Sequence, residues 1–194
     1  MKKVVFILPG YFDSTKELGY QEIGKCFLTL GYKIVFVEIV WKYKRVQDYL
    51  KQLTDLYQKE KGEENIILGF SFGALVSYLS APLLLPDKLY LCSIAPYFKE
   101  DLDYIPEEDK VAIGKKRLGD IEYLSFDDIA DQIICPVTIF YGENEQMFVR
   151  RRVQLAKEKI KNCKTIEVPN AGHDISNIDY IEGVKKEICS GFTS

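Results

Sequence analysis

Apolar stretches of strand length alternate along this chain with longer segments in which apolar residues recur at helical spacing. Short apolar runs rich in β-branched and aromatic residues predict buried strands, whereas apolar positions three to four residues apart predict amphipathic helices. The predicted strands cover residues 3–8, 33–39, 65–69, 88–94, 136–141 and 164–168. Their alternation with helical segments predicts an α/β protein with a parallel sheet and helices on both faces.

The segments between the strands carry signals for the ends of helices. The sequence Ser14-Thr15-Lys16-Glu17 has the pattern of a capping box, in which the Ser and Glu side chains satisfy free backbone N–H groups, and the helix that follows is expected to run to Gly31. A helix that begins at the Gly69–Gly73 turn is expected to end at Pro82, because proline interrupts helical hydrogen bonding. Further helices are expected over 45–61, 146–161 and 177–190.

Residues 98–124 interrupt this alternation. They are rich in charge and contain Pro106, Gly114 and Gly119, and a short helix is expected to follow from Ser125. A segment of this length between two strands predicts either a surface excursion, which could bind a partner, or a small lid.

Length and composition predict one globular domain that spans residues 1–194, with an apolar fraction of 47% and a charged fraction of 28%. Lys2 and Lys3 precede an apolar run that soon reaches Pro9-Gly10, so this start is interpreted as a first strand and not as a signal peptide. No run approaches the roughly 20 apolar residues that cross a bilayer. We therefore expect a cytoplasmic protein without a membrane anchor.

Charge and cysteine content narrow the expected partners. The net charge is −3 and charges of both signs are interleaved, so nucleic acid is not an expected partner. The five cysteines are scattered among apolar neighbours and are interpreted as buried free thiols. With one histidine and no Cys-x-x-Cys, the sequence predicts no metal site, and no cofactor is expected. The sequence leaves the oligomeric state open.

The strongest local motif is Gly69-Phe70-Ser71-Phe72-Gly73, which stands directly after a predicted strand and directly before a predicted helix. A nucleophilic serine needs a tight, strained turn that lifts its hydroxyl clear of the sheet, and the two glycines allow it because a side chain at either position would crowd the neighbouring backbone. The alternative is that Ser71 only caps the helix. Phosphate-binding loops fit less well, since the lysine or the third glycine of their motifs is missing.

His173 lies in a predicted loop after the last strand, at the same edge of the sheet as Ser71. As the sole imidazole in the chain, it is the candidate general base, although a lone histidine can also be structural. A carboxylate at that edge would orient the imidazole, and Glu143 and Glu145 both follow the strand at 136–141. The order serine, acid, histidine is the order found on α/β-hydrolase scaffolds.

In these elements and their order, over nearly its full length, the chain resembles the α/β-hydrolase superfamily. The resemblance implies a three-layer fold with a mostly parallel sheet of about six strands that lacks the first two family strands, as in its minimal single-domain serine hydrolases and esterases. The family's acid commonly stands three residues after a glycine, which favours Glu145, where the usual residue is Asp. The segment 127–137 is similar to the family's run into that strand, and residues 170–173 are similar to its histidine loop.

The resemblance also implies an oxyanion hole. Members of the family carry a His-Gly turn after their third strand, and here Pro9-Gly10-Tyr11 matches it with proline in place of histidine. The backbone N–H groups of Tyr11 and Phe72 are therefore the expected donors.

The function expected from these residues is hydrolysis of a carboxylic ester or thioester through an acyl-enzyme on Ser71, with a small-molecule acyl substrate. Pocket walls are expected just beyond strand ends, chiefly from Trp41, Tyr97 and Phe98, although each could be a core residue instead. Other residues expected there are Val40, Tyr43, Ala95 and Pro96. Two alternatives stay open: a peptidase, acyltransferase or carbon–carbon hydrolase with the same three residues, and a non-catalytic or regulatory binding protein.

Overall fold

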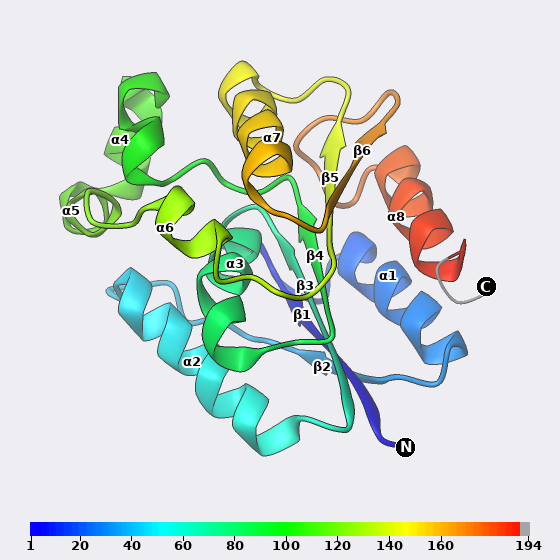
Figure 1. The fold of residues 1–194 in the computed structure, drawn as a ribbon. Coiled ribbons are helices and arrows are strands. Elements are labelled where there is room, and N and C mark those ends of the chain that lie inside the picture. Colours follow the sequence, from blue (N-terminus) through cyan, green and yellow to red (C-terminus); the bar gives the residue numbers. More distant parts are fainter. Residues whose placement is uncertain (191–194) are drawn as a thin grey trace.

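The computed structural model describes residues 1–190, which contain a six-stranded sheet (Figure 1). Every pair of neighbouring strands is parallel, in the order β2-β1-β3-β4-β5-β6. The strands are β1 (Lys3–Leu8), β2 (Lys33–Phe36), β3 (Glu64–Phe70), β4 (Lys88–Cys92), β5 (Val137–Gly142) and β6 (Cys163–Val168). The predicted parallel sheet is confirmed.

Two strands end earlier than predicted. β2 stops at Phe36, although Val37 N still donates to Ile7 O at 2.9 Å, and the chain then leaves the sheet. β4 stops at Cys92 because Ser93 adopts a positive φ of 45°, which turns the backbone out of the extended conformation.

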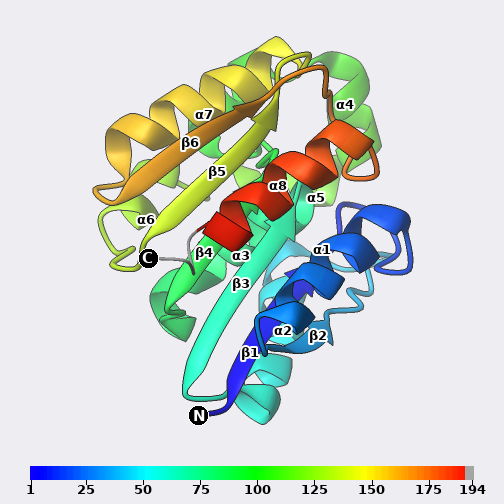
Figure 2. The same ribbon diagram turned by 90° about the vertical axis from the view of Figure 1, so that its right-hand side faces the viewer.

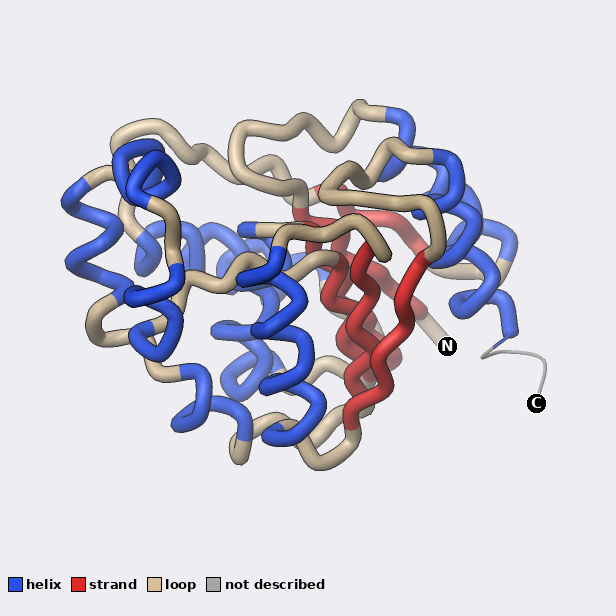
Figure 3. Tube along the Cα trace, turned by 90° about the horizontal axis from the view of Figure 1, so that it is seen from above, coloured by secondary structure: helices blue, strands red, loops and turns tan. Residues whose placement is uncertain are grey.

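Helices cover both faces of the sheet (Figures 2 and 3). One face is covered by α1 (Leu18–Thr29) and α8 (Ile178–Ser190). The other is covered by α2 (Val46–Glu60), α3 (Phe72–Leu84), α6 (Phe126–Ala130) and α7 (Met147–Lys159). The result is a three-layer architecture of helices, sheet and helices.

The alternation of side chains along β1 explains the two cores. Val4, Phe6 and Leu8 pack in the core beneath α2 and α3, while Val5 and Ile7 pack in the core beneath α1 and α8. All five side chains are fully buried, since successive residues of a strand point to opposite faces and here both faces are covered. This is why the central strands appear in the sequence as continuous apolar runs.

The prediction that Pro82 ends its helix is wrong. α3 continues through Pro82 to Leu84 and ends where Leu85 takes the left-handed conformation, with φ of 50°. Proline disturbs only the last turn of this helix, and Ala81 and Leu84 remain buried in the core, so packing outweighs the lost hydrogen bond.

The predicted capping box is only partly formed. Ser14 N donates to Glu17 Oε1 at 2.9 Å, but Ser14 Oγ accepts from Lys16 N at 3.2 Å. α1 begins at Leu18, later than predicted, because these bonds close a turn before the helix.

The excursion, defined here as residues 98–124, forms a 3-10 turn and two short helices. These elements are η1 (Lys99–Tyr104), α4 (Glu107–Ile113) and α5 (Lys115–Ile121). They enclose a small core of Ile105, Ile113 and Ile121, separate from the two cores of the sheet. In Figure 1 this segment lies above α2 and beside α6, at one end of the molecule.

The cysteines differ in exposure. Cys26, Cys92 and Cys135 are buried, as predicted, whereas Cys163 is half-buried and Cys189, in the last turn of α8, is exposed. Between residues 1 and 190, no helix combines the length and the apolar character needed to cross a bilayer.

Candidate active site

Ser71 lies in the turn between β3 and α3, with φ of 52° and ψ of −116°. A positive φ is strained for a residue with a side chain, at a cost on the order of 1–3 kcal/mol. The turn is held by the end of β4, because Ser71 N donates to Cys92 O at 2.8 Å and Ser71 O accepts from Ala95 N at 3.1 Å. The predicted strained turn between strand and helix is therefore present.

The two glycines of the motif are required by space. A Cβ added to Gly69 would lie 2.4 Å from Gly73 O, and a Cβ added to Gly73 would lie 2.3 Å from Pro9 O. These are backbone contacts that a rotamer change cannot relieve. The expected crowding at both positions is confirmed.

The side chain of Ser71 does not cap α3 but contacts His173. It stands at the N-cap position of α3 but accepts no backbone N–H there. Its Oγ lies 2.9 Å from His173 Nε2, and the other ring nitrogen, Nδ1, lies 3.1 and 3.0 Å from the two carboxylate oxygens of Glu145. The structure thus joins a hydroxyl, an imidazole and a carboxylate in one hydrogen-bonded row.

Glu143 and Glu145 have different partners. The Glu145 side chain is fully buried and faces the imidazole, whereas Glu143 accepts from Asn170 N at 3.0 Å through Oε2. Both loops approach closely at Gly142, where an added Cβ would lie 2.3 Å from Ala171 O. Glu145 therefore contacts the histidine, and Glu143 holds the loop that carries it.

The imidazole of His173 rests against buried aromatic rings. Its centroid lies 5.1 Å from that of Phe70, which in turn meets Tyr180 edge-on at 6.0 Å. Tyr180 Oη lies 2.8 Å from Ser93 Oγ and donates to Phe140 O at 3.2 Å. Burial raises the pKa of Tyr180 well above its usual range, so the phenol stays protonated and available as a donor.

The loop that carries Tyr11 is fixed by a second buried tyrosine. Tyr20 Oη accepts from Gly10 N at 2.8 Å and donates to Asp13 Oδ2 at 2.7 Å. Burial first, and then the charge of Asp13, raise the pKa of this phenol, which therefore remains a donor. Sequence reasoning did not select Tyr20, because an aromatic on the apolar face of a helix looks like any other core residue.

Tyr11 and Phe72 both lie beside Ser71, where they line one hollow with it. Phe72 is the first residue of α3, so its N–H has no acceptor within that helix. Among residues 1–190, no acceptor for Tyr11 N or Phe72 N is present. These two groups are therefore available to a bound oxygen atom.

Three hollows meet at Ser71. The first, about 190 Å³, contains His173 and is lined on its other side by Asp13, Glu17 and Asp174. The second, about 210 Å³, also contains His173, together with Ala95, Pro96 and Tyr97. The third, about 90 Å³, lacks His173; we call it the inner hollow, and its lining is Tyr11, Ser71, Phe72, Tyr97, Ala112, Ile113 and Arg117.

The predicted pocket residues are divided between hollows and core. Tyr97 lines two of the three hollows, and its burial raises its pKa to about 12. Phe98 is fully buried against Tyr78 and Phe126, and it lines none of the three. Trp41 is buried behind Tyr11, at 5.6 Å between ring centroids, and lines none of them either. These two rings follow strand ends as expected, but both are buried in the core beneath α2 and α3, against other aromatic rings.

Three lining residues of the inner hollow come from the excursion and were not selected from the sequence. They are Ala112 and Ile113, at the end of α4, and Arg117, in α5 beyond Gly114. Their segment has no repeat and no motif, so nothing in the sequence placed them near Ser71.

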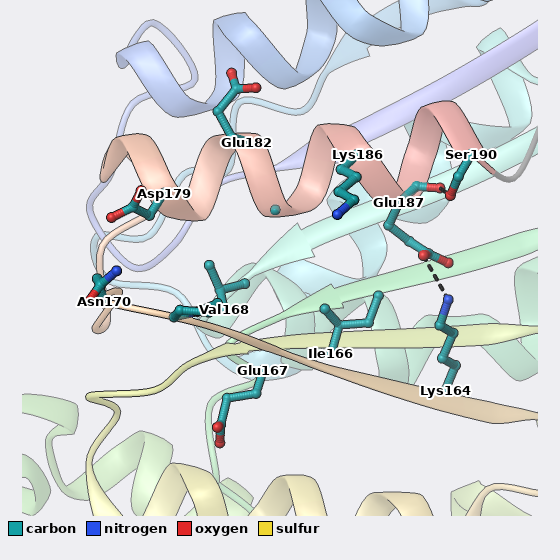
Figure 4. Close-up of a pocket in the computed structure, with 12 residues that line it drawn as sticks. Lys164, Ile166, Glu167, Val168, Asn170, Asp179, Glu182, Lys186, Glu187 and Ser190 are labelled. Atoms are coloured by element: carbon teal, nitrogen blue, oxygen red, sulfur yellow. Dashed lines mark hydrogen bonds and ion pairs between the residues drawn. The ribbon is translucent and has the colours of Figure 1, made fainter.

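A larger hollow of about 760 Å³ lies apart from Ser71, between β6 and α8 (Figure 4). It contains none of Ser71, Glu145 or His173, and an ion pair of 2.7 Å joins Lys164 and Glu187 across it. Within the described part of the chain, no three His, Cys, Asp or Glu side chains gather where they could hold a metal ion. The candidate site is therefore the region around Ser71.

Comparison with known proteins gives structural neighbours only. No protein-family model matches this chain, and no curated protein matches its sequence. Est1E from Butyrivibrio proteoclasticus superposes with a TM-score of 0.81 at 16% identity, over 100% of this chain and 89% of that chain. Alpha/beta hydrolase domain-containing protein 10 from mouse superposes with a TM-score of 0.73 at 13% identity, over 96% and 88%.

Naproxen esterase from Bacillus subtilis superposes with a TM-score of 0.72 at 15% identity, over 99% of this chain and 84% of that chain. These neighbours share the parallel sheet and its flanking helices at low sequence identity. The protein therefore has the α/β-hydrolase fold.

Proposed function

We propose that this protein is a serine hydrolase that cleaves a carboxylic ester or thioester through an acyl-enzyme on Ser71. The observation that carries the proposal is the hydrogen-bonded row from Glu145 through His173 to the Ser71 hydroxyl. One structural neighbour is named an esterase and another a thioesterase domain, which is consistent with this reaction on the same fold.

In the first half of the reaction, His173 Nε2 takes the proton of Ser71 Oγ as that oxygen attacks the acyl carbonyl. Glu145, against Nδ1, keeps the imidazole in the required tautomer and stabilises its protonated form. The carbonyl oxygen becomes an oxyanion that accepts from Tyr11 N and Phe72 N, and one such donor contributes about 3–4 kcal/mol. The tetrahedral species then collapses: the bond to the leaving group breaks, and His173 gives the leaving group its proton.

In the second half, water enters against the acyl-enzyme and His173 again acts as the base. The water oxygen bonds to the acyl carbon, the bond to Ser71 Oγ breaks, and the proton returns from His173 to the serine. The products are a carboxylic acid and the alcohol or thiol. No cofactor takes part in this sequence of steps.

The test combines active-site labelling with turnover. We expect a fluorophosphonate probe to label the wild type and p-nitrophenyl acetate to be hydrolysed, with both lost in Ser71→Ala, where turnover falls on the order of 10⁵-fold. Ser176→Ala is the matched control, because that serine lies near the same rim and its Oγ accepts from Gly19 N at 3.3 Å.

Two results would reject the proposal. Folded wild-type protein that neither reacts with the probe nor hydrolyses any ester or thioester would favour a binding protein. Labelling that persists in Ser71→Ala would assign the nucleophile to another residue.

A further inference from the structure

A cleft rich in basic residues adjoins the inner hollow. It has a volume of about 520 Å³ and lies between the start of α2 and the excursion. Five of its nine lining residues are Lys or Arg and one is acidic; the nine are Tyr43, Lys44, Arg45, Asp48, Ile113, Gly114, Lys115, Lys116 and Arg117. In a chain of net charge −3 this is a local excess of positive charge, which attracts anions.

Within residues 1–190, most of these cations have no counter-ion. Arg45 pairs with Asp120, but no ion pair engages Lys44, Lys115, Lys116 or Arg117 among residues 1–190. A cation whose charge is not compensated within the protein is free to bind an anionic ligand.

Arg117 is the residue that connects the basic cleft with Ser71, because it lines both the cleft and the inner hollow. Its guanidinium is held by neutral acceptors: Nε donates to Tyr49 Oη at 2.8 Å, Nη2 to Trp41 O at 2.9 Å and Nη1 to Ile113 O at 3.0 Å. A guanidinium has five N–H groups, so two remain. The side chain is thus fixed in place while its charge stays uncompensated.

The proton transfers of the proposed function indicate which part of a substrate faces Arg117. The leaving group receives its proton from His173, so it occupies a hollow that contains this histidine. The inner hollow lacks His173 and is left for the acyl chain. The first hollow, of about 190 Å³, is lined by Asp13, Glu17 and Asp174, whose negative charges would repel an anionic acyl group.

Volume sets the length of that chain. The inner hollow measures about 90 Å³. One water molecule takes up about 30 Å³ of liquid, so the hollow accepts roughly three heavy atoms before a chain reaches Arg117 and the cleft.

Resting on the proposed function, we infer that the preferred acyl group is short and ends in an anionic group, either a carboxylate or a phosphonate. That anion binds the free N–H groups of Arg117 together with Lys115 and Lys116, whose side chains are exposed on the cleft. The substrates of this description are monoesters or monothioesters of short dicarboxylic acids and their phosphorus analogues.

The test compares esters that differ only in charge. Monoethyl glutarate has three methylenes and a carboxylate, its neutral match is the ethyl ester of glutaric acid monoamide, and ethyl 4-phosphonobutanoate supplies the phosphorus anion. Ethanol release gives kcat/KM for each. We expect either anionic ester to exceed the amide about tenfold or more, the effect of one hydrogen bond to a charged group, and the better of the two identifies the anion.

The variants locate the effect. In Lys115→Gln/Lys116→Gln the ratio of kcat/KM for the anionic ester to that for the amide should fall about tenfold, and Arg117→Gln should lower it further. Lys110→Gln is the matched control, because Lys110 belongs to the same excursion but pairs with Glu107 and does not line the cleft; its ratio should equal that of the wild type. Raising the salt concentration should lower the ratio in the wild type.

Calorimetric binding of free glutarate and of 4-phosphonobutanoate gives a readout that does not depend on turnover. If the protein hydrolyses the amide ester, and kcat/KM for both anionic esters is equal to or lower than that for the amide ester, this inference is overturned. The proposed serine hydrolase function is not affected by that result. Binding of one of these anions that is lost in Lys115→Gln/Lys116→Gln, without hydrolysis of any ester, supports the anion site and overturns the proposed function. Absence of both preference and binding overturns the anion site.

Discussion

The rim around Ser71 and the excursion over it are built in different ways. Ser71, Glu145 and His173 follow directly from β3, β5 and β6, so the hydrogen-bonded backbone of the sheet fixes their positions. The excursion has no strand; it consists of short helices around a small core of its own. The first region carries the groups that the proposed function assigns to the reaction, and the second contributes Ala112, Ile113 and Arg117 to the inner hollow.

Under the proposed function, the rim supplies the reacting groups and the excursion contributes to the choice of substrate. Parallel strands bring their carboxyl ends to one edge, so groups far apart in sequence meet there with little freedom. A helical excursion depends on side-chain packing and can change its lining residues without disturbing the sheet. Substitutions in the two regions should therefore affect different measured quantities.

The largest expected effect is a loss of kcat on substitution at the rim. It should differ between two neighbouring carboxylates, Glu145 and Glu143. Glu145→Gln should lower kcat for a neutral ester by about 10⁴-fold, because an amide cannot stabilise the protonated imidazole and favours the wrong tautomer. Glu143→Gln should have little effect, since the amide oxygen can still accept from Asn170 N. Steady-state kinetics on both variants decides the matter, and the reverse ranking would assign the acid to Glu143.

A smaller effect is expected where the excursion is anchored. Asp101 in η1 forms a buried pair with Arg152 of α7, with Arg152 Nε 2.9 Å from Oδ2 and Nη2 2.6 Å from Oδ1. Their side chains are 1% and 2% exposed. Arg152→Met would leave Asp101 buried with only Arg151 as a partner, at 3.2 Å, so the free energy of unfolding should fall by about 3–5 kcal/mol in urea titrations.

Two further variants control this prediction. Arg150→Met, two residues earlier in the same helix, removes a partly exposed pair with Glu167 and should cost at most about 1 kcal/mol. Arg152→Met combined with Asp101→Leu should recover much of the loss, because no unpaired charge stays buried. Equal losses for Arg150→Met and Arg152→Met would show that the buried pair does not anchor the excursion.

The smallest effect is expected where the excursion ends. Ser125 Oγ accepts from Asp128 N at 3.2 Å, which caps α6, and donates to Glu100 Oε1 at 2.8 Å. Ser125→Ala should lower the free energy of unfolding by about 1 kcal/mol, the usual value of an N-cap, while Ser125→Thr keeps both hydrogen bonds and should lose less. Urea titrations of the two variants measure the difference; a greater loss in Ser125→Thr would contradict the capping role.

The sequence predicted most of what depends on local pattern. All six strands and the turn at Ser71 were expected near their observed positions, because buried strands need continuous apolar runs and the turn needs its glycines. The loops of Glu145 and His173 were expected at one edge because the carboxyl ends of parallel strands lie at the same edge of the sheet. Pro82 misled the prediction because proline lowers intrinsic helix stability, whereas the observed end of α3 depends on the burial of Leu84.

Tertiary structure alone decided which side chains surround Ser71. Trp41, Tyr97 and Phe98 have similar sequence contexts, yet only Tyr97 lines the hollows, since a ring is buried or exposed according to what packs against its two faces. The sequence by itself determined the sheet and the residue types at its edge. The place of Arg117 beside Tyr11 required the folded excursion, because contacts between distant segments leave no periodic trace in the sequence.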